Sequence, residues 1–168
     1  RSWSLGGGRE YRGLFRILTE AHLPFGVVED SALKGAGRLE GAQVVVLPDA
    51  RCLSDGAVAV LEGYVAAGGR LLATGQPATR DGEGEPREGV ALGCLGVGRV
   101  ARALERERGS YLRIRPEDKA VLEGFGDADL VHLDVPFLSC EPAPGVRTFL
   151  SRIPPAMFGP PEKCYYGA

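Results

Sequence analysis

The chain has 168 residues, of which 44% are hydrophobic and 25% charged, and its formal net charge is -2. The length allows one domain with a sizeable core, and without a basic surplus to hold a phosphate backbone we expect no nucleic-acid partner. No apolar run reaches the roughly 18–20 residues of a membrane span and residues 1–8 lack a signal pattern, so we expect a cytoplasmic protein without a membrane partner.

The first part of the chain predicts one amphipathic helix followed by a short strand. Apolar residues recur at helical spacing over 10–22, and Pro24 ends that helix. Residues 25–28 (FGVV) then form a short β run. A parallel α/β domain of this kind normally begins with a central strand. Here residues 2–5 are either a very short first strand, or that strand lies upstream of the chain.

The clearest unit is a strand, a helix and a second strand over residues 43–75. Residues 43–47 (QVVVL) are continuously apolar and β-branched, as expected of a parallel strand covered on both faces. Ser54 is a favourable N-cap for the next helix, and a Gly-Gly pair ends it. Residues 70–74 (RLLAT) form the second strand. The order favours a right-handed crossover within a doubly wound α/β sheet.

The second half of the chain predicts shorter elements. We expect a long exposed loop over 80–89, a helix over 97–107 and a strand over 111–114. A short helix over 117–125 follows, and then two β runs over 130–138 and 146–153 that form a hairpin. Residues 153–168 hold two Pro-Pro pairs, which exclude a helix or a central strand. We therefore expect an α/β domain over 1–152 and a proline-rich arm over 153–168, the start of a truncated continuation.

The cysteines predict neither a metal site nor a redox pair. Cys52, Cys94, Cys140 and Cys164 are far apart and form no CxxC motif. A chain of this length also has no need of disulfide staples. We expect idle or buried thiols in a cytosolic protein, with no metal and no cofactor.

Three stretches carry a resemblance to a known family. They are YRGLFRILTEAHLPFGVVED (11–30), VVVLPDARCLSDGAVAVLEGYVAAGGRLLATG (44–75) and PPAMFGPPEKCYYG (154–167). They resemble the middle, trimerisation domain of β-galactosidases of glycoside hydrolase family 42 and of related glycosidases. The resemblance implies a class I glutamine-amidotransferase-like domain, a flavodoxin-like three-layer sandwich with a mainly parallel sheet. To this the sequence adds a C-terminal β-hairpin and the proline-rich arm.

The resemblance also implies a function. In that family the catalytic carboxylates lie on a separate (β/α)8 barrel, and this chain is far too short to contain one. It implies a non-catalytic accessory domain of a β-galactosidase-like glycoside hydrolase, acting in interdomain packing or oligomerisation. Its partners would be the catalytic barrel of the parent chain and further copies of itself.

The residues themselves do not support an active amidotransferase. That chemistry needs a cysteine on a sharp strand-to-helix turn, beside a backbone N–H that stabilises the oxyanion. The turn after residues 70–74 reads Gly75-Gln76-Pro77, which has no cysteine, and Pro77 has no N–H to donate. We expect a degenerate site.

Two cysteines keep open an alternative, a cysteine-dependent hydrolase or amidotransferase. Cys94 lies in a glycine-rich turn and could pair with His132, with Asp134 nearby, although alternation makes His132 an ordinary strand residue. Cys52 follows the strand over 43–47. A depressed thiol pKa would distinguish a nucleophile from a structural thiol.

A third interpretation places a ligand or a subunit contact at the carboxyl edge of the two apolar strands, where α/β folds bind ligands. The candidates are Asp49, Arg51, Cys52, Gly75 and Gln76. A ligand there would make the chain a small-ligand-binding flavodoxin-like module. The simpler interpretation is that Asp49 and Ser54 satisfy loop and helix-cap backbone groups, with Cys52 packed beneath.

Aromatic residues of the arm are the candidates for docking a partner domain. Phe158, Tyr165 and Tyr166 are of the type enriched at the cores of interfaces. The alternative is that they fold back onto the sheet of this domain.

Overall fold

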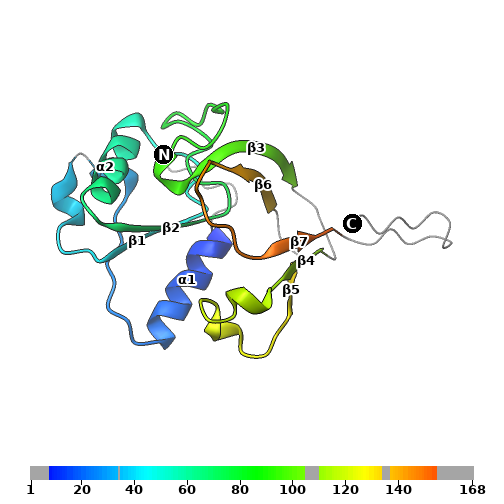
Figure 1. The fold of residues 1–168 in the computed structure, drawn as a ribbon. Coiled ribbons are helices and arrows are strands. Elements are labelled where there is room, and N and C mark those ends of the chain that lie inside the picture. The colour runs from blue at the N-terminus through cyan, green and yellow to red at the C-terminus, as the bar shows by residue number, and fades with distance from the viewer. Residues whose placement is uncertain (1–7, 34, 105–109, 134–136, 155–168) are drawn as a thin grey trace. The chain divides into compact units, whose positions relative to one another are not determined.

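The computed structural model describes residues 8–33, 35–104, 110–133 and 137–154, which belong to two compact units. The first unit comprises residues 1–101 and 140–144, and the second comprises 102–139 and 145–168. Figure 1 labels the helices and strands, which are α1 (Gly8–Glu20), β1 (Val44–Pro48), α2 (Asp55–Ala66), β2 (Arg70–Thr74), β3 (Val97–Leu104), β4 (Ser110–Arg113), β5 (Leu130–Leu133), β6 (Phe137–Pro142) and β7 (Ser151–Ile153).

The predicted strand–helix–strand unit is confirmed. β1 and β2 are parallel, in a register that runs from Val44 opposite Arg70 to Pro48 opposite Thr74. Ser54 caps α2, since its side chain accepts a hydrogen bond from the Ala57 N–H at 3.2 Å. Local sequence signals are sufficient to build this part of the chain.

The core of the first unit lies on one face of this strand pair. α2 packs there over the inward side chains of both strands, and the loops that follow the strands close the cluster. Its buried members are Leu33, Leu39, Leu47, Leu53, Ala57, Leu61, Ala78 and Leu92.

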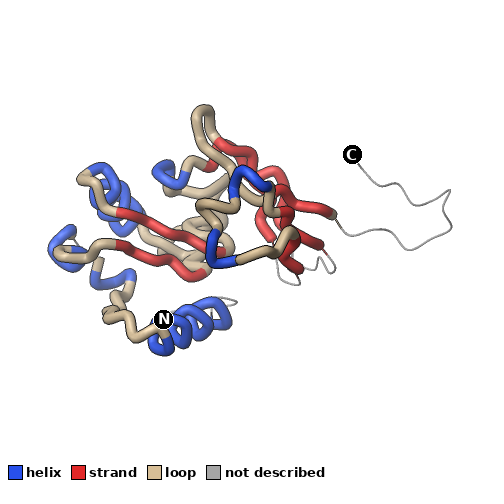
Figure 2. Tube along the Cα trace, turned by 60° about the horizontal axis from the view of Figure 1, so that its bottom comes forward, coloured by secondary structure: helices blue, strands red, loops and turns tan. Residues whose placement is uncertain are grey.

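The other face of the strand pair is only partly covered. Figure 2 shows α1 on the side opposite α2, and α1 contacts β1. Even so Val44 is 48% exposed and Leu72 is 54% exposed. The prediction that residues 43–47 are covered on both faces is therefore wrong, and an apolar strip of the sheet faces outward.

The flavodoxin-like three-layer sandwich is also wrong as a prediction. The described residues contain one parallel pair, β1–β2, beside a β3–β6 pair and an antiparallel sheet of order β5-β4-β7. Residues 25–28 stay outside the strands, because no described strand pairs with them. The predicted first strand over 2–5 lies outside the described residues.

Two further errors concern the second half of the chain. Residues 97–104 form β3 rather than a helix, because they pair with β6. The predicted hairpin of 130–138 with 146–153 does not form. β5 and β7 instead take opposite sides of β4, with Tyr111 opposite both His132 and Ile153.

A buried carboxylate ties the second unit together. Asp118 is almost fully buried, and it accepts hydrogen bonds from Arg115 Nε at 2.9 Å and from an Arg147 terminal nitrogen at 3.4 Å. Arg115 also donates to the Thr148 carbonyl at 3.0 Å. The short helix Pro116–Asp118 is thereby joined to the segment that leads into β7.

The predicted proline-rich arm lies almost wholly outside the described residues. Only Ile153 and Pro154 of residues 153–168 are described, and Ile153 ends β7, so the boundary at 152 stays a prediction. None of the helices in the described part of the chain combines the length and the apolar character that a membrane span requires.

The core position of Leu61 gives a stability prediction. Leu61 has no exposed surface, whereas Ile17 on α1 is 62% exposed. Leu61→Ala should lower the free energy of unfolding by about 3 kcal/mol, because it leaves a cavity under α2. Ile17→Ala should change it by less than about 0.5 kcal/mol. Urea unfolding followed by circular dichroism measures both, and equal losses would contradict this location of the core.

Candidate site at the carboxyl edge of the parallel strands

Backbone hydrogen bonds join the loop that follows β1 to the loop that follows β2. The Asp49 N–H donates to Thr74 O at 3.2 Å, and the Ala78 N–H donates to Ala50 O at 2.9 Å. Further along, the Arg80 N–H donates to Arg51 O at 2.9 Å. The carboxyl edge of the parallel pair is therefore a fixed framework, and it holds most of the site residues that the sequence predicted.

Asp49 is the centre of this framework. It is 5% exposed, and its Oδ1 accepts the Gln76 N–H at 2.9 Å. Both of its carboxylate oxygens lie near Arg51 Nε, at 3.1 and 2.9 Å. A buried carboxylate needs such partners, because desolvation would otherwise penalise its charge.

Gly75 is required beside this carboxylate for two reasons. Its φ is +69°, in the left-handed region that favours glycine. A Cβ at this position would also lie 2.3 Å from Asp49 Oδ1. The turn after β2 therefore exists in this form only with a glycine.

The predicted candidates are thus brought together in part. Asp49, Arg51, Gly75 and Gln76 form one contact set. Cys52 is half-buried in the same loop, where its backbone bridges to Arg80. The simpler interpretation also matches, since Asp49 satisfies the Gln76 N–H and Ser54 caps α2.

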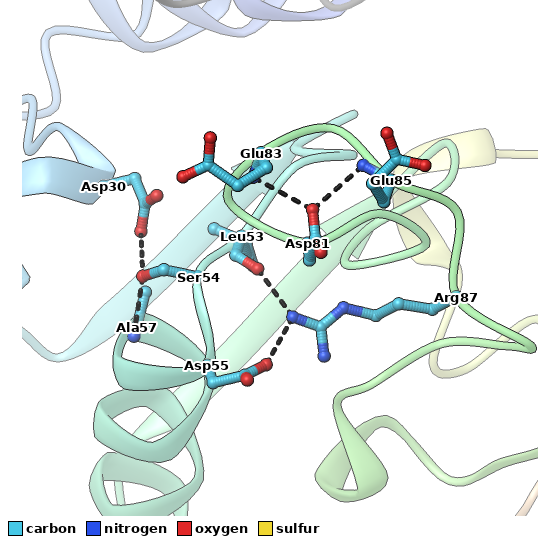
Figure 3. Close-up of polar contacts among 9 residues, drawn as sticks. All are labelled: Asp30, Leu53, Ser54, Asp55, Ala57, Asp81, Glu83, Glu85 and Arg87. Atoms are coloured by element: carbon cyan, nitrogen blue, oxygen red, sulfur yellow. Dashed lines mark hydrogen bonds and ion pairs between the residues drawn. The ribbon is translucent and has the colours of Figure 1, made fainter.

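A second polar network lies at the start of α2, as Figure 3 shows. Ser54 Oγ lies 3.3 Å from Asp30 Oδ1. An Arg87 terminal nitrogen donates to Leu53 O at 2.9 Å and to Asp55 Oδ1 at 2.6 Å. Arg87 is a residue that the sequence analysis missed, because its partners lie far away along the chain.

The loop over 80–89 is more ordered than its composition implied. Asp81 Oδ1 accepts the N–H groups of both Glu83 and Glu85 at 2.9 Å (Figure 3). An Asp followed by a glycine-containing turn is a local signal for this arrangement. The two glutamate side chains are exposed, and no group of three or more potential metal ligands occurs in the described ranges.

The thiols of Cys94 and Cys140 are not activated. Burial, followed by the nearby charge of Glu62, raises the pKa of the Cys94 thiol to about 11. Burial also raises the pKa of Cys140. His132 belongs to the other unit, where its ring lies 5.2 Å from that of Tyr111. Asp134 lies outside the described residues.

The arm candidates cannot be placed. Phe158, Tyr165 and Tyr166 lie outside the described residues, so their docking role stays a prediction. Comparison with known proteins identifies no family, since no family model and no curated protein matches the chain. The resemblance to family 42 β-galactosidases therefore rests on the quoted stretches alone.

The contact between Gly75 and Asp49 can be tested with a matched pair of glycines. Gly84 has a similar left-handed φ of +93° but open space around it. Gly84→Ala should cost about 1 kcal/mol of unfolding free energy from φ alone, and Gly75→Ala should cost at least about 2 kcal/mol because the methyl group meets the carboxylate. Urea unfolding measures both. Equal losses would mean that Asp49 moves aside freely.

The raised pKa of Cys94 predicts slow alkylation. At pH 8 a thiol of pKa about 11 carries roughly two orders of magnitude less thiolate than an ordinary cysteine. Iodoacetamide should label Cys94 slowly in the folded chain, about tenfold faster for each pH unit between 8 and 10, and rapidly in urea. Peptide mass spectrometry resolves this rate from those of the other cysteines. Fast labelling at pH 7 would restore Cys94 as a candidate nucleophile.

Proposed function

We propose that this chain is a non-catalytic accessory domain of a β-galactosidase-like glycoside hydrolase, and that it acts in interdomain packing or oligomerisation. The observation that carries the proposal is the apolar surface that the first unit leaves exposed. This surface comprises the exposed apolar side chains of α1, of the irregular segment over 23–28 and of the outward face of β1 and β2, and we call it the apolar face.

The α1 helix contributes side chains that its own unit does not bury. None of its residues is buried, although Leu14 and Leu18 are half-buried. Phe15 is 46% exposed, and Tyr11 is exposed beside it with ring centroids 6.2 Å apart. An amphipathic helix with this little burial gains little from its own unit, and a partner would cover its aromatic side.

The segment after α1 continues the same surface. Phe25 meets Phe15 edge to face, with centroids 5.1 Å apart. Leu23, Val27 and Val28 are exposed in this irregular segment. Aromatic residues of this kind are enriched at interface cores, and contiguous apolar patches on soluble proteins commonly mark interaction sites.

The strand pair supports the same proposal. Within the described residues β1 and β2 form a two-stranded sheet, so each of them has an outer edge that no described strand pairs with. Proteins commonly place charges or prolines along an exposed edge to block it. In this pair such residues stand only at the ends, at Pro48 of β1 and Arg70 of β2, and Val44 to Leu47 carry none. Such an edge, beside a half-covered apolar face, favours contact with a further element.

The alternative enzymatic function, a cysteine-dependent hydrolase, is less well supported. Activation of a nucleophile requires a lowered thiol pKa, and the pKa of Cys94 is raised. The parent catalytic barrel as a partner, and self-association, follow from the resemblance and the apolar face together. The cytoplasmic location is part of the proposal, and the free thiols of Cys52 and Cys94 are in keeping with it.

Light scattering after gel filtration tests the apolar face. If the chain is an oligomer, we expect Phe15→Gln to shift it toward monomer. If the chain is a monomer, we expect it to enhance the fluorescence of anilinonaphthalene sulfonate, and Phe15→Gln should reduce that enhancement. Glutamine retains helix propensity, so α1 itself should persist. The matched control is Val121→Gln, at an exposed apolar residue of the other unit, and it should have no effect.

Two results would overturn the proposal. One is a monomer that does not bind the dye, because its apolar face would then be covered. The other is hydrolysis of a chromogenic β-galactoside by the chain itself, abolished by a substitution within it.

A further inference from the structure

We propose that Arg51 is an oxyanion-binding residue, which holds a carboxylate or phosphate group of a small ligand at the carboxyl edge of β1 and β2. This inference does not rest on the proposed assembly function, because Arg51 is not part of the apolar face.

The first observation is the set of hydrogen-bond donors that Arg51 keeps available. A guanidinium has five N–H donors, and Arg51 uses its Nε to donate to the two oxygens of Asp49. Its two terminal nitrogens have no hydrogen-bond partner among the described residues. The side chain is 27% exposed, so it is partly accessible to a ligand from solution.

Two other partly buried arginines behave differently. Arg87 uses a terminal nitrogen for Leu53 O and Asp55, and Arg115 uses one for Thr148 O. Both join elements of the fold through the end of the guanidinium. Arg51 is held through Nε instead, and that leaves the forked end for an external acceptor.

The second observation is the rigidity of its support. The Asp49 carboxylate is fixed by the Gln76 N–H, and Arg51 O accepts the Arg80 N–H. A guanidinium fixed in advance loses little rotamer freedom on binding, which is the main cost of using a long side chain. The framework is therefore preorganised for a ligand.

The third observation is backbone strain at the same edge. Asp49 has a φ of +47° and the fully buried Ala78 has a φ of +51°. A left-handed alanine has no side-chain hydrogen bond to offset its steric cost. Strain of this kind gathers at functional sites, where surrounding packing holds it.

The geometry also selects the class of ligand. The two terminal nitrogens of a guanidinium match the paired oxygens of a carboxylate or a phosphate. The carboxyl edge of parallel strands is where α/β units place their ligands. Because Asp49 already balances the charge of Arg51, binding of the oxyanion depends on directed hydrogen bonds more than on net charge. Chloride, which lacks paired oxygen acceptors, should therefore bind poorly in its place.

Nuclear magnetic resonance titration with inorganic phosphate and with acetate tests this inference. We expect saturable shifts of the Gly75 and Gln76 amides and of Arg51 Nε, at millimolar probe, and no such shifts with sodium chloride at equal ionic strength. Arg51→Gln should abolish saturation. Arg51→Lys keeps a charge beside Asp49 but lacks the fork, and it should weaken binding at least fivefold. Arg38→Gln, at an exposed arginine of the same unit, should leave it unchanged.

The outcomes separate this inference from others. Unsaturable shifts, or equal shifts in Arg51→Gln or with chloride, would overturn it. Self-association that is lost in Arg51→Gln without phosphate or acetate binding would identify the acceptor as an acidic side chain of another chain, and would also overturn it. Phe15→Gln should bind phosphate as the unmodified chain does, so failure of the assembly proposal leaves this result distinct. Circular dichroism confirms that each variant is folded.

Discussion

The first unit depends on one buried carboxylate at the place where its two parallel strands end. Asp49 accepts the backbone N–H of Gln76, which follows β2, and pairs with Arg51, which follows β1. This contact fixes the two loops relative to each other and leaves room only for glycine at position 75. A buried charge without these partners would be strongly unfavourable, so the loops and the carboxylate stabilise each other.

A unit organised in this way has a small core and a large remainder of apolar surface. α2 covers one face of the strand pair, while α1 covers the other only in part. No described strand pairs with the outer edges of β1 and β2, and small sheets gain stability mainly by packing against further elements. The contacting aromatic residues Tyr11, Phe15 and Phe25 stay exposed as a result of this incomplete burial.

The sequence predicted what depends on neighbouring residues, and failed where distant partners decide. The cap at Ser54 and the apolar run of β1 are local, and both were correct. Residues 97–104 became a strand because β6 pairs with them, and no local pattern reports that partner. The site shows the same division. Asp49, Arg51, Gly75 and Gln76 follow from their place at strand ends, whereas the partners of Arg87 lie 32 and 34 residues away.

Three described side chains that could take part in covalent chemistry are instead committed to structural contacts or shifted away from reactivity. Asp49 is committed to Arg51 and Gln76, and Asp118 is committed to Arg115 and Arg147. Cys94 is shifted away from thiolate formation by burial beside Glu62. What the described chain presents outward is an apolar face and a fixed guanidinium with free donors. Both features are of the kind that recognises other molecules, which is why the two proposals concern an interface and an oxyanion site.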